Sequence, residues 1–359
     1  MSSPFVFATC HLGAERALKA EVARDRPDLR PAFGRPGLVT WKATAPEGVP
    51  SLLDAVFARV TGFALGPAGS TGEVIEHARA LGAKPPLRLH AFPRDAKHPR
   101  EGDVTDEASL AAAAELRAAL LAAAPDLLVD PEALPRQGDP VLDVIVAPGE
   151  PHFVGHHVHG PRRSPHAGGR IPVEVPGDAP SRAFRKIEEA IVWSGMAVGA
   201  GQIAVEIGSA PGGASLALLR RGLAVTGVDP GAMAPVVLAH PRFRHLRLPV
   251  AELRLDDLPP RVDWLILDVN LAPQVALHAA RALVAARRRS LRGVFFTLKL
   301  NDWSLAERVP DLLRRVEAMG LAQVRATQLP SNRQEICVVA AAPGRARGTG
   351  GPGRSRRDG

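Results

Sequence analysis

The second half of the chain alternates short apolar runs with segments whose apolar residues recur at helical spacing. Short runs rich in β-branched side chains are typical of buried parallel strands. We predict such strands at Ile203–Ile207, Ala224–Val228, Arg244–Leu248, Val262–Leu267 and Arg292–Leu298. Helices are expected at 214–221, 273–288 and 304–319, with a closing antiparallel pair of strands at 322–328 and 334–341. The alternation indicates an α/β fold with a doubly wound, Rossmann-like sheet of seven strands.

The first half has a different pattern, in which strands and helices do not alternate regularly. It opens with a strand at 4–9, an amphipathic helix at 13–24, a returning strand at 37–42 and a second helix at 49–59. This β-α-β-α order is typical of a ferredoxin-like module. Further elements are expected at 87–92, 108–124 and 141–146. We interpret residues 1–160 as one α+β domain that places a substrate.

Between the two halves, the composition shifts toward proline, glycine and histidine. The histidines stand at positions 152, 156, 157, 159 and 166, and Arg162, Arg163 and Arg170 accompany them. A metal site is one interpretation, but no HExxH, paired CxxC or partnered carboxylate spacing supports it, so we predict none. A polar segment near a nucleic acid and an ordinary solvated linker are the alternatives. We assign 161–180 as a linker, followed by a domain over 181–342.

A small-residue loop follows the first strand of this second domain. It consists of Gly208, Ser209, Ala210, Pro211, Gly212 and Gly213. Glycines allow a ligand to approach the backbone, and the helix that follows offers free N–H groups. A dinucleotide fingerprint requires glycine where this loop has Ala210, which disfavours a dehydrogenase. Asp229 ends the next strand, where a carboxylate can accept both hydroxyls of a ribose. The pair suits S-adenosyl-L-methionine, which has a ribose and no phosphate.

Two more charged residues end predicted parallel strands, and two others lie elsewhere in the same half. Asp268 and Lys299 follow or end strands, Lys186 lies on a helix at 181–194, and Glu335 begins the last strand. The carboxyl ends of parallel strands share one edge of a sheet, so Asp229, Asp268 and Lys299 are expected to meet there. A lysine can act as a general base when burial and a second ammonium favour its neutral form. Lys299 is the candidate base.

In chain order, these residues read Lys186, Asp268, Lys299 and Glu335, and here the sequence resembles the FtsJ-like ribose 2′-O-methyltransferases. The matching segments are 147–149, 175–182, 186–190, 210–213, 228–229, 298–300 and 333–335. They are most similar to the RlmM type, which methylates a cytidine ribose in large-subunit (23S) ribosomal RNA. The resemblance implies a catalytic tetrad of these four residues, a class I methyltransferase fold, and a ferredoxin-like/THUMP RNA-binding domain at the N-terminus. Asp268 also belongs to the implied cofactor site.

The sequence departs from the family at two positions. Leu248-Pro249-Val250 stands where an acidic residue usually meets the adenine, and Ala183 replaces a serine. Glu252 or a backbone amide is a possible substitute for the acid. The first departure favours an alternative: a non-catalytic RNA-binding or ribosome-assembly factor on a methyltransferase scaffold. Methylation of a base nitrogen fits less well, because that reaction commonly needs a polar-Pro-Pro-aromatic loop where this chain has Asp268-Val269-Asn270-Leu271. Methylation of a pyrimidine carbon needs a nucleophilic cysteine, and neither Cys10 nor Cys337 lies on a suitable loop.

Charge and composition add the expected setting. The 359 residues carry a net charge of +8. Half of this positive excess lies in the tail, which contains five arginines between 345 and 357 and one acidic residue, Asp358. We expect residues 343–359 to be a disordered basic tail. The net positive charge of the chain favours a polyanionic partner, which we expect to be ribosomal RNA. Only Cys10 and Cys337 are present, and no signal peptide or membrane span is recognisable. A cytoplasmic protein without membrane contact, favoured as a monomer, is the expectation.

Overall fold

The computed structural model describes residues 4–45, 52–95, 97–98, 107–129, 134–147 and 149–344. The chain divides into two compact units, which we describe separately. The N-terminal unit comprises Met1–Pro172 with two segments from the second half of the chain, Leu300–Arg308 and Thr327–Ile336. The C-terminal unit comprises Val173–Lys299, Val309–Ala326 and Cys337–Gly359. The predicted tail lies outside the described residues from position 345 onward.

The N-terminal unit is built on one sheet with strand order β2-β3-β1-β4-β8-β7-β5-β6. Its strands are β1 (Phe5–Thr9), β2 (Leu29–Arg35), β3 (Leu38–Ala43), β4 (Val60–Ala68), β5 (Leu87–Pro93), β6 (Leu128–Val129), β7 (Pro140–Val146) and β8 (His152–Val158). Its helices are α1 (Glu15–Asp25), α2 (Thr71–Ala80) and α3 (Glu107–Ala123), with a short 3₁₀ turn η1 (Ala167–Gly169). β1 pairs antiparallel with β3 and β4, whereas β5 pairs parallel with β6 and β7.

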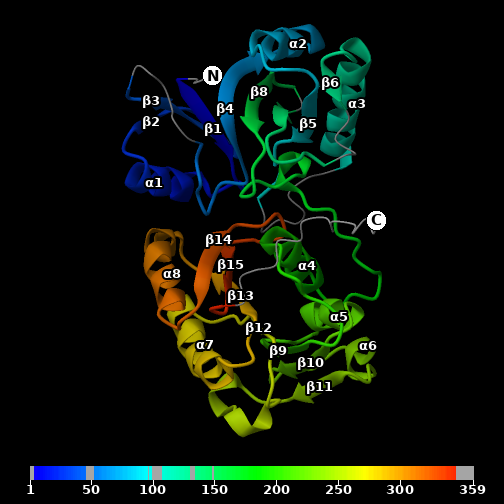
Figure 1. Ribbon diagram of the computed structural model, residues 1–359, viewed down its shortest axis with the longest axis vertical. Helices are drawn as coiled ribbons and strands as arrows, with labels where there is room; N and C mark the ends of the chain where they lie inside the picture. The colour runs from blue at the N-terminus through cyan, green and yellow to red at the C-terminus, as the bar shows by residue number, and fades with distance from the viewer. Residues whose placement is uncertain are drawn as a thin grey trace, which may run out of the picture. The chain divides into compact units, whose positions relative to one another are not determined.

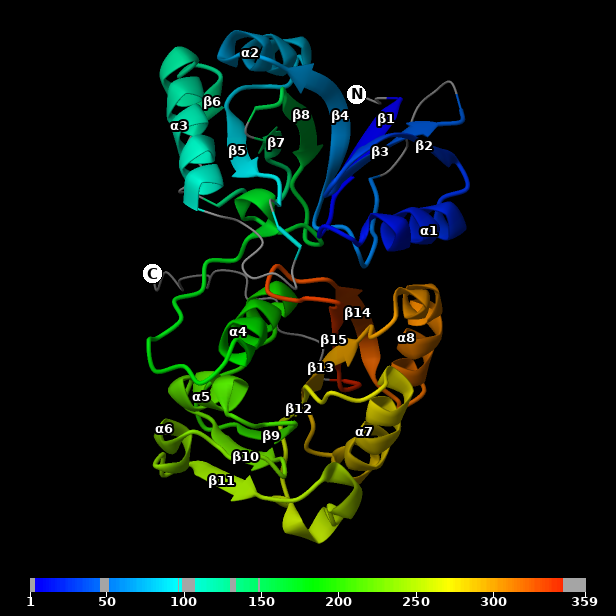
Figure 2. The same ribbon diagram turned by 180° about the vertical axis from the view of Figure 1, so that it is seen from behind.

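The part of this unit around β5 and β7, which Figure 2 shows beside α3, is held together by buried apolar side chains. Leu89 of β5, Leu142 of β7 and Leu120 of α3 are fully buried in one cluster. The helix α2 joins the same cluster through Val74. It begins after Ser70, whose hydroxyl accepts a hydrogen bond from the Glu73 N–H at 3.2 Å, so a capping serine fixes its start.

Two predictions for this unit are wrong. The described part of the expected helix at 49–59 is irregular, because tertiary contacts hold the backbone: the amides of Val56 and Phe57 donate to the Glu21 carboxylate. The opening order is therefore β1-α1-β2-β3-β4-α2 rather than β-α-β-α. The segment interpreted as polar and linker-like contains a strand, β8, whose histidines find partners inside the sheet. The ferredoxin-like/THUMP assignment stays a prediction.

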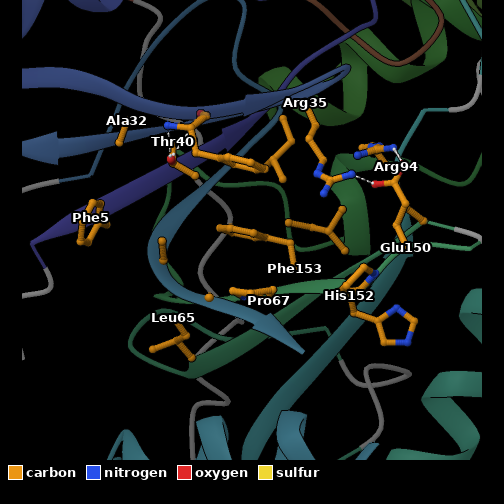
Figure 3. A pocket seen from close by; sticks show the side chains of 17 residues that line it. Phe5, Ala32, Arg35, Thr40, Leu65, Pro67, Arg94, Glu150, His152 and Phe153 are labelled. Atoms are coloured by element: carbon orange, nitrogen blue, oxygen red, sulfur yellow. Dashed lines mark hydrogen bonds and ion pairs between the residues drawn. The ribbon is translucent and has the colours of Figure 1, made fainter. Parts of the chain in front are cut away.

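A cavity of about 620 Å³ opens beside β1, β2, β3 and β8 in this unit (Figure 3). Phe5, Phe33 and Phe153 line its apolar part, and Arg35 and Arg94 lie at its polar end. Both arginines bond the same carboxylate, with Arg35 Nη1 and Arg94 Nη2 at 2.5 and 3.0 Å from the oxygens of Glu150. The arginine charges are thus partly neutralised within the unit.

The C-terminal unit is built on a seven-stranded sheet with order β11-β10-β9-β12-β13-β15-β14. The strands are β9 (Ile203–Ile207), β10 (Ala224–Val228), β11 (Phe243–Leu246), β12 (Trp264–Leu267), β13 (Gly293–Lys299), β14 (Ala322–Thr327) and β15 (Glu335–Ala341). Pairings from β11 through β13 are parallel. The first five strands follow the doubly wound order. The last two are placed against their order in the chain, so that β15 lies next to β13 and β14 forms the edge of the sheet. The predicted Rossmann-like α/β sheet is confirmed.

Helices cover both faces of this sheet (Figures 1 and 2). α4 (Ala183–Ser194), α5 (Gly213–Arg220) and α6 (Pro235–Leu238) lie on one face, and α7 (Pro273–Arg287) and α8 (Val309–Glu317) on the other. α8 is preceded by a 3₁₀ segment, η4 (Trp303–Arg308), where the sequence predicts continuous helix. None of the helices that the structure describes has both the length and the apolar character to span a membrane.

Candidate functional site

The loop between β9 and α5 is shaped by glycines at positions that exclude side chains. Gly208 and Gly212 have φ of +85° and +112°, a region that favours glycine. A Cβ at Gly208 would collide with the backbone carbonyl of Asp268, and one at Gly212 would lie 2.7 Å from a methyl group of Val237. The loop therefore packs directly against the end of β12, and any ligand at this edge meets its backbone.

Asp229 follows β10 and holds two backbone segments together. Its Oδ2 accepts a hydrogen bond from the Ala210 N–H at 3.1 Å, and its Oδ1 accepts one from the Gly231 N–H at 2.7 Å. Each carboxylate oxygen offers more than one lone pair, so both retain capacity for a further donor such as a ribose hydroxyl. The loop and the carboxylate predicted to bind one ligand are thus joined by a hydrogen bond.

The side chain of Ser209, by contrast, is buried in the protein. Its hydroxyl donates to the sulfur of Met233 at 3.6 Å, and the residue is only 2% exposed. Packing therefore explains its small size, and any contact it makes with a cofactor would come from its backbone.

Glu206, within β9, is a charged residue that the sequence reasoning did not single out. It is 1% exposed, and its carboxyl accepts a hydrogen bond from the hydroxyl of Ser215 at 2.5 Å. Burial raises the pKa of Glu206 to about 8, and the nearby carboxylates of Asp268 and Asp229 add to that rise. The signal was present in the sequence, as an acidic residue in the middle of an otherwise apolar strand.

Lys186, Asp268 and Lys299 meet at the carboxyl edge of the sheet. The Nζ atom of Lys186 donates to Asp268 Oδ2 at 2.6 Å, and the Nζ atom of Lys299 donates to Asp268 Oδ1 at 2.8 Å. The three side chains are between 11% and 18% exposed. A single carboxylate thus holds two ammonium groups next to each other, with all three side chains partly exposed.

The positions of these three side chains follow from the fold. Lys299 is the last residue of β13, and Asp268 comes directly after β12. β12 and β13 are parallel neighbours, with Leu267 opposite Phe296, so their ends fall at one edge. Lys186 reaches the same carboxylate from α4, whose opposite face buries Phe184, Ile187 and Ile191. Lys186 thus lies across the helix from the buried stripe and still contacts Asp268.

Glu335, the fourth predicted member, is the first residue of β15 and belongs to the N-terminal unit. It is 4% exposed, and the side-chain amide of Asn332 donates to its Oε1 at 3.4 Å. Its membership in a tetrad with the two lysines stays a prediction. Glu252, the suggested substitute for the missing acidic residue, lies exposed in the turn η2 (Val250–Glu252).

A histidine of β8 forms a buried contact with a carboxylate of the N-terminal unit. His157 Nδ1 lies 2.6 Å from Asp143 Oδ2, and His90 Nδ1 lies 3.7 Å from Asp143 Oδ1. Burial works to raise the pKa of Asp143, but the two imidazoles hold it down at about 2. In the part of the chain that the structure describes, no group of histidine, cysteine or carboxylate side chains has the geometry to hold a metal ion.

Comparison with known proteins finds sequence relatives that are methyltransferases by name. No protein-family model matches the chain. Proteins named ribosomal RNA large subunit methyltransferase M from Laribacter hongkongensis and Halorhodospira halophila are each 37% identical to it over 188 residues, covering 49% and 50% of this chain and 51% and 52% of theirs. The protein of the same name from Alkalilimnicola ehrlichii is 33% identical over 222 residues, 59% of each chain.

Among solved structures, TrmN from Thermus thermophilus is 16% identical, with a TM-score of 0.34 over 94% of this chain and 99% of that one. A TehB-like SAM-dependent methyltransferase from Corynebacterium glutamicum is 14% identical, with a TM-score of 0.32 over 47% and 89%. The chain spans about half the length of the first curated relatives that it matches, and those relatives are ribosomal RNA large subunit methyltransferases by name.

Proposed function

We propose that this chain is an S-adenosylmethionine-dependent methyltransferase that modifies a ribose 2′-hydroxyl of large-subunit ribosomal RNA. The observation that carries the proposal is the pair of ammonium groups held by Asp268, beside a glycine loop that is bonded to Asp229. The names of the curated relatives support the reaction class and the RNA substrate. The finer target, a cytidine of 23S ribosomal RNA, rests on the sequence resemblance.

The donors and acceptors at this edge fit the cofactor. The loop 208–213 presents backbone where Cβ atoms would collide, and Asp229 keeps lone pairs for two ribose hydroxyls. We assign Gly208–Gly213, Asp229 and Asp268 to this site. When bound, S-adenosylmethionine supplies an electrophilic methyl group on a sulfonium.

The residues of the chain perform the proton chemistry. Lys299 in its neutral form accepts the proton of the ribose hydroxyl as the oxygen forms its bond to carbon and the carbon–sulfur bond breaks. Lys186 supplies a neighbouring positive charge that favours the neutral form of Lys299 and orients the hydroxyl. Asp268 fixes both Nζ atoms, and Glu335 completes the proposed tetrad. Strand ends provide the rigid in-line placement that the reaction needs.

The remaining assignments follow from this function. Residues 1–160 are proposed as the RNA-binding domain, residues 161–180 as the linker, 181–342 as the catalytic domain and 343–359 as a basic tail. The cytoplasm is the proposed location, because the proposed substrate is ribosomal RNA. The second candidate is a non-catalytic assembly factor, which the exposed position of Glu252 and the apolar Leu248-Pro249-Val250 segment favour.

Two measurements test the proposal and separate it from this alternative. Calorimetry with S-adenosylmethionine should give saturable heat; no heat at millimolar cofactor would favour the assembly factor. Incubation of the full chain with methyl-labelled cofactor and transcribed 23S ribosomal RNA should give one site that resists alkaline hydrolysis. A transcript with 2′-deoxycytidine at that site should accept no label, and label on that transcript would contradict a ribose target.

A further inference from the structure

The segment that leads into Glu335 is a compact loop closed by its own hydrogen bonds. The Leu329 N–H donates to Asn332 Oδ1 at 2.8 Å, and the Asn332 N–H donates back to the Leu329 carbonyl at 2.9 Å. The side-chain amide of Asn332 is oriented by the first of these bonds, and its nitrogen lies 3.4 Å from Glu335 Oε1. Leu329, Asn332 and Glu335 are all buried. The orientation of the Glu335 carboxylate therefore depends on the position of this loop.

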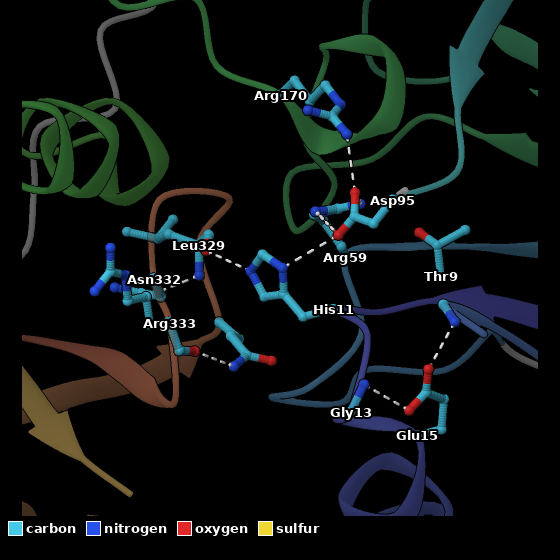
Figure 4. A network of polar contacts seen from close by, with 12 residues as sticks. Thr9, His11, Gly13, Glu15, Arg59, Asp95, Arg170, Leu329, Asn332 and Arg333 are labelled. Atoms are coloured by element: carbon cyan, nitrogen blue, oxygen red, sulfur yellow. Dashed lines mark hydrogen bonds and ion pairs between the residues drawn. The ribbon is translucent and has the colours of Figure 1, made fainter. Parts of the chain in front are cut away.

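Residues near the N-terminus of the chain fix the same loop from outside. The carbonyl of Val56 accepts a hydrogen bond from the Gln328 N–H at 2.8 Å. His11, which follows β1, places its Nε2 atom 2.9 Å from the Leu329 carbonyl oxygen (Figure 4). Although 318 residues separate them in sequence, His11 and Leu329 belong to the same compact unit. Two hydrogen bonds thus tie the loop before Glu335 to the first strand and to the segment before β4.

The His11 ring lies between a backbone carbonyl and a buried carboxylate. Its Nδ1 atom lies 3.2 Å from Asp95 Oδ2, so each ring nitrogen faces an oxygen that can only accept. The ring of His11 is therefore held at both of its nitrogen atoms. Asp95 is itself fixed by two hydrogen bonds from Arg59, at 2.6 and 3.0 Å, and by one from Arg170 at 2.9 Å. The side chains of His11 and Asp95 are at most 1% exposed.

We infer that His11 is a positioning residue for methyl transfer, which acts by holding the Leu329 carbonyl and, through Asn332, the orientation of Glu335. The inference rests on the proposed function, since it gives Glu335 a role in the tetrad. It adds a reason for the N-terminal unit beyond contact with a substrate: part of that unit's core keeps a proposed catalytic carboxylate in place. Neither His11 nor Asp95 has a pattern in the sequence that predicts this role.

The test replaces His11 by alanine in the full chain. We expect kcat for RNA methylation to fall by about tenfold, the effect of losing one hydrogen bond. The Kd for S-adenosylmethionine should stay within about twofold, because the cofactor loop belongs to the other unit. Hydrogen exchange at the amides of 328–332 should become faster. The matched control is His77→Ala, which removes an imidazole from a carbonyl contact of 3.1 Å at Pro67 and should change none of these values.

A second variant keeps the test decisive if His11→Ala folds poorly. Asn332→Asp retains the acceptor for the Leu329 N–H but places a carboxylate against Glu335, so kcat should fall by about tenfold or more with cofactor affinity kept. Combining both substitutions should lower kcat by less than the product of the single effects. Wild-type kcat in either folded variant, or unchanged exchange of the loop in His11→Ala, would overturn the inference. An inactive wild-type chain with faster loop exchange in His11→Ala would instead refute the proposed function.

Discussion

Two carboxylates, one in each unit, are surrounded by cations in different ways. Asp268 lies between Lys186 and Lys299, each of which gives it one hydrogen bond, and its side chain is 13% exposed. Asp95 takes two hydrogen bonds from Arg59, with others from Arg170 and His11, and its side chain is 0% exposed. The group of Lys186, Asp268 and Lys299 is partly exposed to solvent. The group of Asp95 and Arg59 is enclosed by the protein.

The choice of cation teaches what each group can do. A lysine can lose its proton, whereas a guanidinium remains charged and binds a carboxylate through a rigid fork. The Asp268 group is therefore suited to proton transfer, and the Asp95 group to holding elements in place. Burial works to raise the pKa of Asp95, but the Arg59 guanidinium and the His11 ring hold that pKa far below its ordinary range. Asp95 is therefore held in its ionised form.

The largest effect is expected at Lys299. Lys299→Ala should lower the methyl-transfer rate by about a thousandfold or more, because general base catalysis is lost, while calorimetry shows unchanged cofactor binding. Lys299→Arg should be equally inactive, since arginine keeps the charge and the bond to Asp268 but cannot accept a proton. Lys19→Ala, at an exposed lysine of α1, is the control. Normal turnover of Lys299→Arg would show that the lysine at Asp268 is not needed for proton transfer, and so would contradict the proposed difference between the Asp268 and Asp95 groups.

The next effect concerns stability and should appear in the Asp95 group. Asp95→Asn leaves the charge of Arg59 buried without a counter-ion, so the free energy of unfolding should fall by about 3–5 kcal/mol. Asp268→Asn should lower it by only about 1 kcal/mol, because the lysines there are closer to solvent. Urea titrations followed by circular dichroism measure both. Equal losses would show that the two carboxylates do not differ in structural role.

The same two groups show how far the sequence predicts the site. Asp268 and Lys299 could be placed together because the strands before them are parallel neighbours, and the ends of such strands meet at one edge. The partners of Asp95 come from positions 11, 59 and 170, which no local period connects. Their meeting depends on a sheet whose strand order the sequence did not reveal. Tertiary contacts likewise overrode the helical period expected at 49–59, where Glu21 binds two backbone amides.

Asp229 extends the comparison to a carboxylate whose contacts in the unit are backbone amides. Asp229→Ala should weaken S-adenosylmethionine binding by about 10- to 100-fold, because two acceptor oxygens for the ribose are lost. The rate at saturating cofactor should change far less, since the proposed base is untouched. Asp256→Ala, at an exposed carboxylate of the turn η3 (Leu255–Asp257), is the control for both measurements. Unchanged affinity in Asp229→Ala would contradict the assignment of this residue to the cofactor site.

The last effect is a pH dependence at Glu206, a buried carboxyl whose hydrogen-bond donor is a hydroxyl. Burial raises its pKa from the ordinary 4.5 to about 8, so between these values the folded chain keeps a proton that the unfolded chain releases. The free energy of unfolding should therefore fall as pH rises through this window, by at most about 1.4 kcal/mol per pH unit, and level off above it. Glu206→Gln, which cannot ionise, should lose this decline and melt about 3 °C or more above wild type at pH 8, with little difference near pH 5. Thermal melts of both proteins across this pH range test the prediction. If the melting temperatures of wild type and Glu206→Gln change with pH in parallel, Glu206 is ionised in the folded chain. A buried carboxylate of this sheet would then be stable without the cationic partners that Asp268 and Asp95 have.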